Sequence, residues 1–173
     1  MKNIQLILAA LISSLVLYSC GEKKDEEIEP LLRMHIEQEV QFKIKNADGV
    51  DLLNPSTEKG LKRFKVYYIV DGKKKLYFEP WLDAPGAYLI QKEWTGEDYV
   101  LRVLLSGPTL KNPNVNGVKT FLEFPDGHTD TITADYHVRP NLRVVTRAYY
   151  NDRLEWDRSI NIGKTVPLQL TYP

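Results

Sequence analysis

The chain has 173 residues, of which 43% are hydrophobic and 27% charged, and its 23 basic and 23 acidic residues give a formal net charge of zero. This balance excludes the basic excess that nucleic-acid binding needs, and no polybasic patch indicates adhesion to anionic lipid. The single cysteine, Cys20, excludes an intramolecular disulfide, so the fold must depend on core burial and strand pairing.

The first nineteen residues have the pattern of a secretion signal. Lys2 carries the early positive charge, and an uncharged run over residues 4–18 follows, mostly of Leu, Ile, Ala and Val. This run is shorter than the ~20 apolar residues that a membrane-spanning helix needs. We therefore predict a signal peptide over residues 1–19.

The run ends in Leu17-Tyr18-Ser19-Cys20-Gly21, where a small residue precedes the cysteine and glycine follows it. This pattern resembles the lipobox of bacterial lipoproteins. In that family the cysteine thiol is diacylated, cleavage occurs before the cysteine, and its new amine is acylated. The resemblance implies that Cys20 is a lipidation site that anchors the chain to a membrane. An ordinary secreted protein with a cysteine near its cleavage site is the alternative.

Residues 20–30 are expected to form a flexible acidic tether, because the stretch 21–27 is charged and contains no apolar side chain. A lysine followed by acidic residues resembles the export signal of Bacteroidota-type lipoproteins. That resemblance implies the outer face of the outer membrane, whereas a generic linker would be compatible with the periplasmic face. Residues 31–173 then form a single domain.

About nine short strands are predicted in this domain. Apolar and polar residues alternate from Arg33 to Lys45, which indicates a half-buried strand. A hairpin over residues 64–78 turns at Asp71-Gly72, since both residues tolerate positive φ. The remaining strands are predicted over residues 87–93, 99–105, 118–124, 128–134, 142–150, 153–157 and 166–172.

This succession of short strands, with turn signals between them and no convincing helix after the signal, favours an all-β fold, an antiparallel β-sandwich. A closed barrel is the main alternative. Two segments, Asp51-Leu52-Leu53-Asn54-Pro55 and the Tyr-rich hairpin at Val66–Lys73, resemble Bacteroidota lipoproteins with sandwich-type domains. The resemblance implies an immunoglobulin-like or transthyretin-like topology, and it implies no activity.

Catalytic and metal-binding motifs are sparse. The sequence contains no Gly-x-Ser-x-Gly, no His-x-x-x-His and no Cys-x-x-Cys. Asp126, His128 and Asp130 alternate and could face a cation, although a Pro-Asp-Gly hairpin turn selects the same residues for backbone reasons. We therefore expect no metal, no cofactor and no catalytic residues, and a hydrolase is the least favoured hypothesis.

The ten Tyr, three Trp and five Phe residues are more informative, because flat aromatic side chains bind sugar rings and protein side chains. Trp81 and Trp94 fall near loops, where an exposed ring is useful. Tyr67, Tyr149 and Arg147 are expected on outer strand faces, as an aromatic and cationic ledge. We predict a ligand-binding site of these five residues.

Besides the hydrolase, two functions follow from this pattern. A binding module for glycan or protein ligands predicts that Trp81 and Trp94 cluster at one loop end, whereas in a purely structural role they would cover the ends of the sandwich. A structural or assembly subunit predicts an accessible edge strand, and Val166–Tyr172 is the candidate because Pro167 cannot donate a ladder hydrogen bond. Trp156 alternates with Leu154 and is expected in the core.

Overall fold

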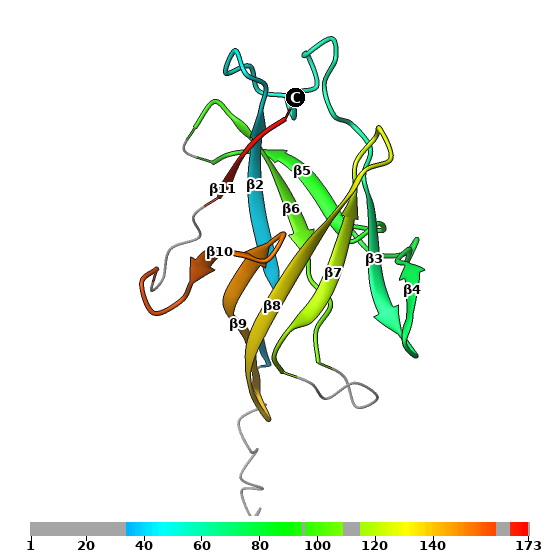
Figure 1. Ribbon diagram of the computed structural model, residues 1–173, viewed down its shortest axis with the longest axis vertical. Helices are drawn as coiled ribbons and strands as arrows, with labels where there is room; N and C mark the ends of the chain where they lie inside the picture. Colours follow the sequence, from blue (N-terminus) through cyan, green and yellow to red (C-terminus); the bar gives the residue numbers. More distant parts are fainter. Residues whose placement is uncertain (1–33, 95, 109–114, 162–166, 173) are drawn as a thin grey trace, which may run out of the picture. The chain divides into compact units, whose positions relative to one another are not determined.

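The computed structural model describes residues 34–94, 96–108, 115–161 and 167–172. These residues form eleven strands and no helix, so the predicted all-β class is confirmed (Figure 1). The compact unit Met34–Pro173 contains every residue of the hydrophobic core. The predicted signal peptide, Cys20 and the tether lie outside the described residues.

The strands belong to two sheets, and the larger has seven of them. Its order is β1 (His35–Glu37), β9 (Leu142–Tyr150), β8 (Thr129–Arg139), β7 (Val118–Glu123), β3 (Lys65–Val70) and β4 (Lys73–Leu76), with β10 (Arg153–Asp157) also paired to β9. The order in the smaller sheet is β11 (Leu168–Thr171), β2 (Glu39–Lys45), β6 (Tyr99–Leu104) and β5 (Tyr88–Lys92).

Both sheets are mixed, so the expectation of purely antiparallel pairing is wrong at two places. β1 pairs with β9, and β11 pairs with β2, in the parallel direction. β1 and β2 are separated at Gln38, whose backbone carbonyl accepts a hydrogen bond of 2.8 Å from the Leu105 N–H and so stays with the smaller sheet. This break divides the strand predicted over Arg33–Lys45 between the two sheets.

The core follows from the alternation that the sequence shows. In β2, Val40, Phe42 and Ile44 are buried, while the residues between them face outward. The Phe42 ring lies 5.5 Å from that of Tyr150 in the larger sheet, so the two sheets share one core. Burying a side chain of this size contributes ~1.5–3 kcal/mol to folding. Trp156 is partly buried and packs against this core, as expected.

Two tight turns have positive φ at both central residues, and the first is the turn predicted at Asp71-Gly72. Asp71 and Gly72 have φ values of 53° and 73° between β3 and β4, and Asn151 and Asp152 have 47° and 67° between β9 and β10. Positive φ at both central positions is the type I′ geometry that suits the twist of a hairpin. These residues therefore determine where both hairpins reverse.

The terminal strands of the two sheets differ. β11 and β5 are the outer strands of the smaller sheet, in agreement with the edge position predicted for the last strand. At one side of the larger sheet β4 is terminal, and all four of its residues are exposed. β4 therefore lies outside the core and is held through its pairing with β3.

Candidate functional site

Trp94 is the most exposed of the predicted site residues. It follows β5 in the hairpin that joins β5 to β6, and 99% of its surface is accessible. The Glu93 N–H donates a hydrogen bond of 2.9 Å to the Asp98 carbonyl, which closes the hairpin beside Trp94. A large, fully accessible aromatic side chain thus lies next to the residue whose hydrogen bond closes the hairpin.

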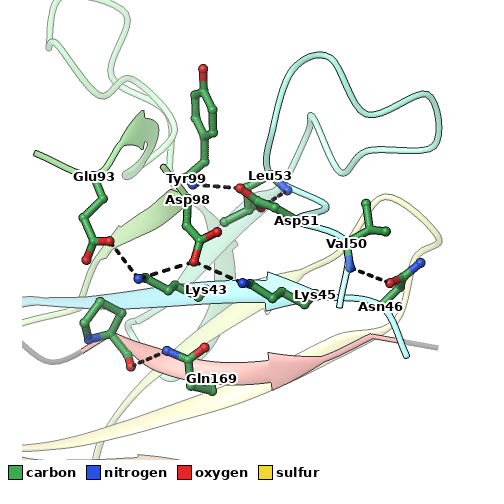
Figure 2. A network of polar contacts seen from close by, with 11 residues as sticks. Lys43, Lys45, Asn46, Val50, Asp51, Leu53, Glu93, Asp98, Tyr99 and Gln169 are labelled. Carbon is green, nitrogen blue, oxygen red and sulfur yellow. Dashed lines mark hydrogen bonds and ion pairs between the residues drawn. The ribbon is translucent and has the colours of Figure 1, made fainter. Parts of the chain in front are cut away.

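A network of ion pairs fixes this hairpin to the neighbouring strand β2 (Figure 2). Lys43 Nζ lies 2.7 Å from Glu93 Oε2 and 3.5 Å from Asp98 Oδ2, and Lys45 Nζ lies 3.1 Å from Asp98 Oδ2. The alternation in β2 directs both lysines outward, toward the hairpin. Two carboxylates flanking Trp94 are therefore tied to two lysines on one strand.

The pKa shifts of Lys43 and Asp98 both favour the charged form of the group. The hydrogen bond from Lys43 to Glu93 raises the pKa of the lysine, although partial burial opposes that effect. The hydrogen bond and the charge of Lys45 lower the pKa of the Asp98 carboxyl, with Lys43 adding to the effect. Both shifts therefore favour the ion pairs that connect the hairpin to β2.

Asp51 braces the same region from the other side (Figure 2). Its Oδ2 accepts a hydrogen bond of 2.7 Å from the Tyr99 N–H at the start of β6, and its Oδ1 accepts one of 2.9 Å from the Leu53 N–H. Leu52 and Leu53 are buried, so this carboxylate connects the core to the hairpin. The stretch Asp51-Leu52-Leu53-Asn54-Pro55, singled out in the sequence, thus has a structural role beside Trp94.

Trp81 lies elsewhere. It belongs to the connection from β4 to β5 and is 77% exposed, but it precedes β5 whereas Trp94 follows it. The five-residue ladder of β5 with β6 separates the two positions. The structure therefore does not bring Trp81 and Trp94 together at one loop end.

Tyr67 lies on the outer face of the larger sheet, as expected. It pairs across strands with Phe121, and Lys74 Nζ lies 4.5 Å and 4.9 Å from the two ring centroids. The Tyr67 hydroxyl donates a hydrogen bond of 2.7 Å to Glu123 Oε2, which raises the pKa of the tyrosine. The partners Phe121 and Lys74 were not predicted, because cross-strand neighbours cannot be read from spacing along the chain.

Tyr149 and Arg147 lie on β9, which β8 and β7 separate from β3. Arg147 Nε is 3.3 Å from Asp157 Oδ2, and the Tyr149 hydroxyl is 3.5 Å from Asp135 Oδ2. The guanidinium is already paired with a carboxylate of β10. These two residues and Tyr67 consequently lie on separate strands of one sheet and do not form one contiguous ledge.

The sequence reasoning missed the residues that brace Trp94. Lys43 and Glu93 are fifty positions apart, and nothing in their local context indicates that they meet. It also missed the local concentration of charge in Lys73-Lys74-Lys75, all exposed on β4. The triplet itself was the available signal, and the neutral total charge concealed it.

A cavity of about 610 Å³ is lined by residues of both sheets, among them Trp156 and Leu168. Its two acidic residues are paired, Glu37 with Arg158 and Glu39 with Arg102, each at 2.5 Å. The hydrogen bond from Arg158 lowers the pKa of Glu37. A general acid in hydrolysis needs the opposite shift, so this arrangement gives the hydrolase hypothesis no support.

The cluster at Asp126, His128 and Asp130 is a packed turn. His128 Nδ1 lies 2.7 Å from Asp126 Oδ1, His128 Nε2 lies 3.4 Å from Asp130 Oδ2, and the imidazole stacks on Phe124 at 4.2 Å. Both ring nitrogens therefore face a carboxylate. Within the described ranges, no group of three or more His, Cys, Asp or Glu residues is arranged to hold a metal ion.

Comparison with protein-family models, with curated proteins and with solved structures finds no match. In the described part of the chain, no helix is long and apolar enough to cross a membrane.

Proposed function

We propose that this chain is a lipid-anchored cell-envelope protein whose β-sandwich domain binds glycan or protein ligands, with Trp94 as the central contact. The observation that carries the proposal is the complete exposure of Trp94 on a hairpin fixed by ion pairs to β2. Tyr67, Tyr149, Arg147 and Trp81 are proposed as further contacts on other surfaces of the domain. The proposal includes no cofactor, no nucleic acid and no catalysis.

Exposure and rigidity together support binding. Leaving a tryptophan in water forgoes the stabilisation that its burial would give, so a ligand that covers the ring gains that free energy. Binding also costs entropy when side chains and loops must be ordered. Because Glu93 and Asp98 already form ion pairs with Lys43 and Lys45, the Trp94 hairpin should lose little backbone entropy on binding.

The experiment substitutes Trp94 by Ala and uses Ile160→Ala as the control, since Ile160 is 82% exposed and lies outside the hairpin. Retardation in gels that contain neutral or acidic polysaccharides measures glycan binding. A photo-reactive aromatic residue at position 94, irradiated in living cells, measures protein contacts. We expect Trp94→Ala to lose the interaction about tenfold or more and Ile160→Ala to keep it. Equal binding of both variants would exclude Trp94 as the contact.

The proposed localisation is the outer membrane, with the lipid anchor at Cys20. The domain would lie at the cell surface or, alternatively, on the periplasmic face. Metabolic labelling with a clickable fatty acid tests the anchor, since Cys20→Ser should abolish the label. Protease added to intact cells tests the face. A surface domain should be cleaved without lysis, and a periplasmic one only after lysis.

An assembly subunit is the second candidate, and one observation favours it. β11 is a terminal strand of the smaller sheet, so one side of Leu168–Thr171 has no strand neighbour among the described residues. Such an edge can accept a strand from another chain. Deleting residues 168–173 should then abolish partner capture. The deletion removes Leu168, Leu170 and Tyr172 from the core, and the rest of the core, which lies before β11, should keep the fold.

A further inference from the structure

The segment from Val70 to Leu82 concentrates exposed apolar side chains. Five of the thirteen large apolar side chains that are exposed in the described residues fall within it, with 41% to 77% of their surface accessible. These five are Val70, Leu76, Phe78, Trp81 and Leu82. Clusters of this kind on a soluble domain mark an interaction surface.

Within the same segment the positive charge is concentrated on β4, while Asp71 and Glu79 reduce the net charge of Val70–Leu82 to +1 (3 − 2). Lys73, Lys74 and Lys75 follow one another on β4, the terminal strand that protrudes beside β3 at the edge of the larger sheet (Figure 1). Lys75 Nζ is 4.0 Å from Asp71, and within the described ranges no carboxylate lies within 4.0 Å of Lys73 or Lys74. The Lys74 ammonium lies over the Tyr67 and Phe121 rings, at 4.5 Å and 4.9 Å from their centroids. All three lysines are nevertheless exposed, so an anionic partner can reach them.

We propose that this surface, the lysine-aromatic edge formed by Lys73–Lys75, Leu76, Phe78 and Trp81, docks the domain onto an anionic phospholipid bilayer. In β4, Lys73 and Lys75 lie on one face and Lys74 and Leu76 on the other, so the strand would meet the bilayer with its outer edge. The lysines reach the headgroup phosphates from both faces of that edge, and the aromatic and aliphatic side chains enter the boundary between headgroups and acyl chains. Phe78 and Trp81 come shortly after β4 in the chain, and both are exposed.

The side-chain types favour a bilayer over the other partners. Sugar rings stack on flat aromatic faces, but the aliphatic Leu76 and Leu82 gain little from such a ligand. Three consecutive lysines on a terminal strand oppose pairing with the edge of another sheet. An anionic bilayer uses the cationic, aromatic and aliphatic groups together, which is why it is the occupant that we infer.

This inference is independent of the ligand proposed for Trp94, because the two surfaces lie at opposite ends of the β5–β6 ladder. It agrees with the proposed anchor at Cys20, since a second attachment strengthens membrane association and would orient the domain. It differs from the expectation, drawn from the sequence, that no polybasic patch adheres to lipid, and the vesicle titration described below decides between the two.

The test uses the chain from Gly21 onward, which retains the compact unit with the whole core and lacks the signal and Cys20. Vesicles of phosphatidylcholine alone, and of phosphatidylcholine with phosphatidylglycerol, are titrated at low and at physiological salt. In a Trp94→Phe, Trp156→Phe background, Trp81 is the single tryptophan, so its emission reports its own environment. Sedimentation of the same vesicles gives the partition coefficient.

We expect binding to the anionic vesicles only, weakened by salt, with a blue shift of Trp81 emission. Replacing Lys73, Lys74 and Lys75 by Gln should weaken the partition about a hundredfold, since each lysine near an anionic surface contributes about fivefold. Trp81→Ser should weaken it about tenfold while Trp94→Ser leaves it unchanged. β4 is exposed at every residue, so these variants should keep the thermal unfolding midpoint, which is measured alongside.

Three results would overturn the proposal. The first is absence of binding to the anionic vesicles at low salt. The second is vesicle binding that the lysine and Trp81 variants leave unchanged. The third is Trp81 emission that, in the sedimented complex, keeps the wavelength of a tryptophan exposed to water. The last result, together with retention by a soluble acidic polysaccharide, would assign the lysines to a glycan. If Trp94→Ala loses polysaccharide binding in gels but keeps vesicle binding, both proposals hold, because the two surfaces then act separately.

Discussion

The β5–β6 hairpin and the β3–β4 hairpin use the same residue types in opposite ways. Around Trp94, lysines and carboxylates are paired at 2.7 to 3.5 Å, so their charges hold the turn in place. On β4 the closest lysine–carboxylate pair is 4.0 Å apart, and Trp81 follows without such bracing. Paired charges thus position a binding residue, whereas unpaired charges remain available to attract a partner.

The largest contrast is expected between Asp51→Asn and Asp71→Asn, which make the same chemical change at the two hairpins. Asp51 accepts hydrogen bonds from the Tyr99 and Leu53 N–H groups, and an amide can satisfy only one of them well. We expect a loss of about 2 kcal/mol in the free energy of unfolding for Asp51→Asn. Asp71 has an exposed carboxylate, and asparagine tolerates its positive φ, so its variant should change stability by less than about 0.5 kcal/mol.

Urea unfolding followed by circular dichroism measures both values. Equal losses for the two variants would mean that the Asp51 carboxylate does not brace the smaller sheet.

A smaller contrast is expected between Lys43→Met and Lys73→Met. Only 17% of the Lys43 side chain is exposed, and its loss leaves Glu93 and Asp98 with fewer cationic partners. We expect a loss of about 1 kcal/mol for Lys43→Met, at the upper end for pairs near the surface, and almost none for Lys73→Met. Amide hydrogen exchange measures the local effect. The Glu93 N–H, which is hydrogen-bonded to the Asp98 carbonyl, should exchange faster in Lys43→Met and at an unchanged rate in Lys73→Met.

If Lys73→Met accelerates the Glu93 amide as much as Lys43→Met does, the two hairpins are not independent. The proposed division between a positioning network and a free charged edge would then be wrong.

The local features of the fold could be predicted because they depend on near neighbours in the sequence. Alternation over Glu39–Lys45 gave the buried face of β2, and Asp71-Gly72 gave a turn with the expected positive φ. The pairing of β1 with β9 and of β11 with β2 could not be predicted. Parallel pairing between distant segments depends on how the sheets pack, and alternation has the same period in either direction.

In the candidate site, too, features that depend on sequence neighbours could be predicted, and features that depend on distant contacts could not. Exposure of Trp81 and Trp94 follows from their position near loops, and both were expected to be accessible. Their separation by the β5–β6 ladder follows from strand order, which spacing along the chain does not reveal. The ion pairs of Lys43 join residues fifty positions apart, so only the folded chain shows which exposed tryptophan is braced.

The smallest effect is expected in the pKa of Asp98. This pKa should respond to a lysine next to the β5–β6 hairpin and not to a lysine of the β3–β4 hairpin. Lys45 and Lys43 lower the pKa of the Asp98 carboxyl in the folded state, so Lys45→Met should raise that pKa toward its ordinary range. Lys75→Met removes a lysine from the other hairpin and should leave it unchanged. Carboxyl-carbon NMR shifts against pH measure the value for this one residue.

The sign of the pH effect follows from the lowered pKa. The stabilisation is fully present above the pKa that Asp98 has in the unfolded chain, and it is lost as the pH falls through the lower pKa of the folded state. Stability from this pair should therefore be constant from neutral pH down to about pH 5 and decline only in stronger acid. A decline that begins near neutral pH, or a pKa that Lys45→Met leaves unaltered, would show that Asp98 is not held by β2. The Trp94 hairpin would then lack the ion pair that distinguishes it from the segment that contains Trp81.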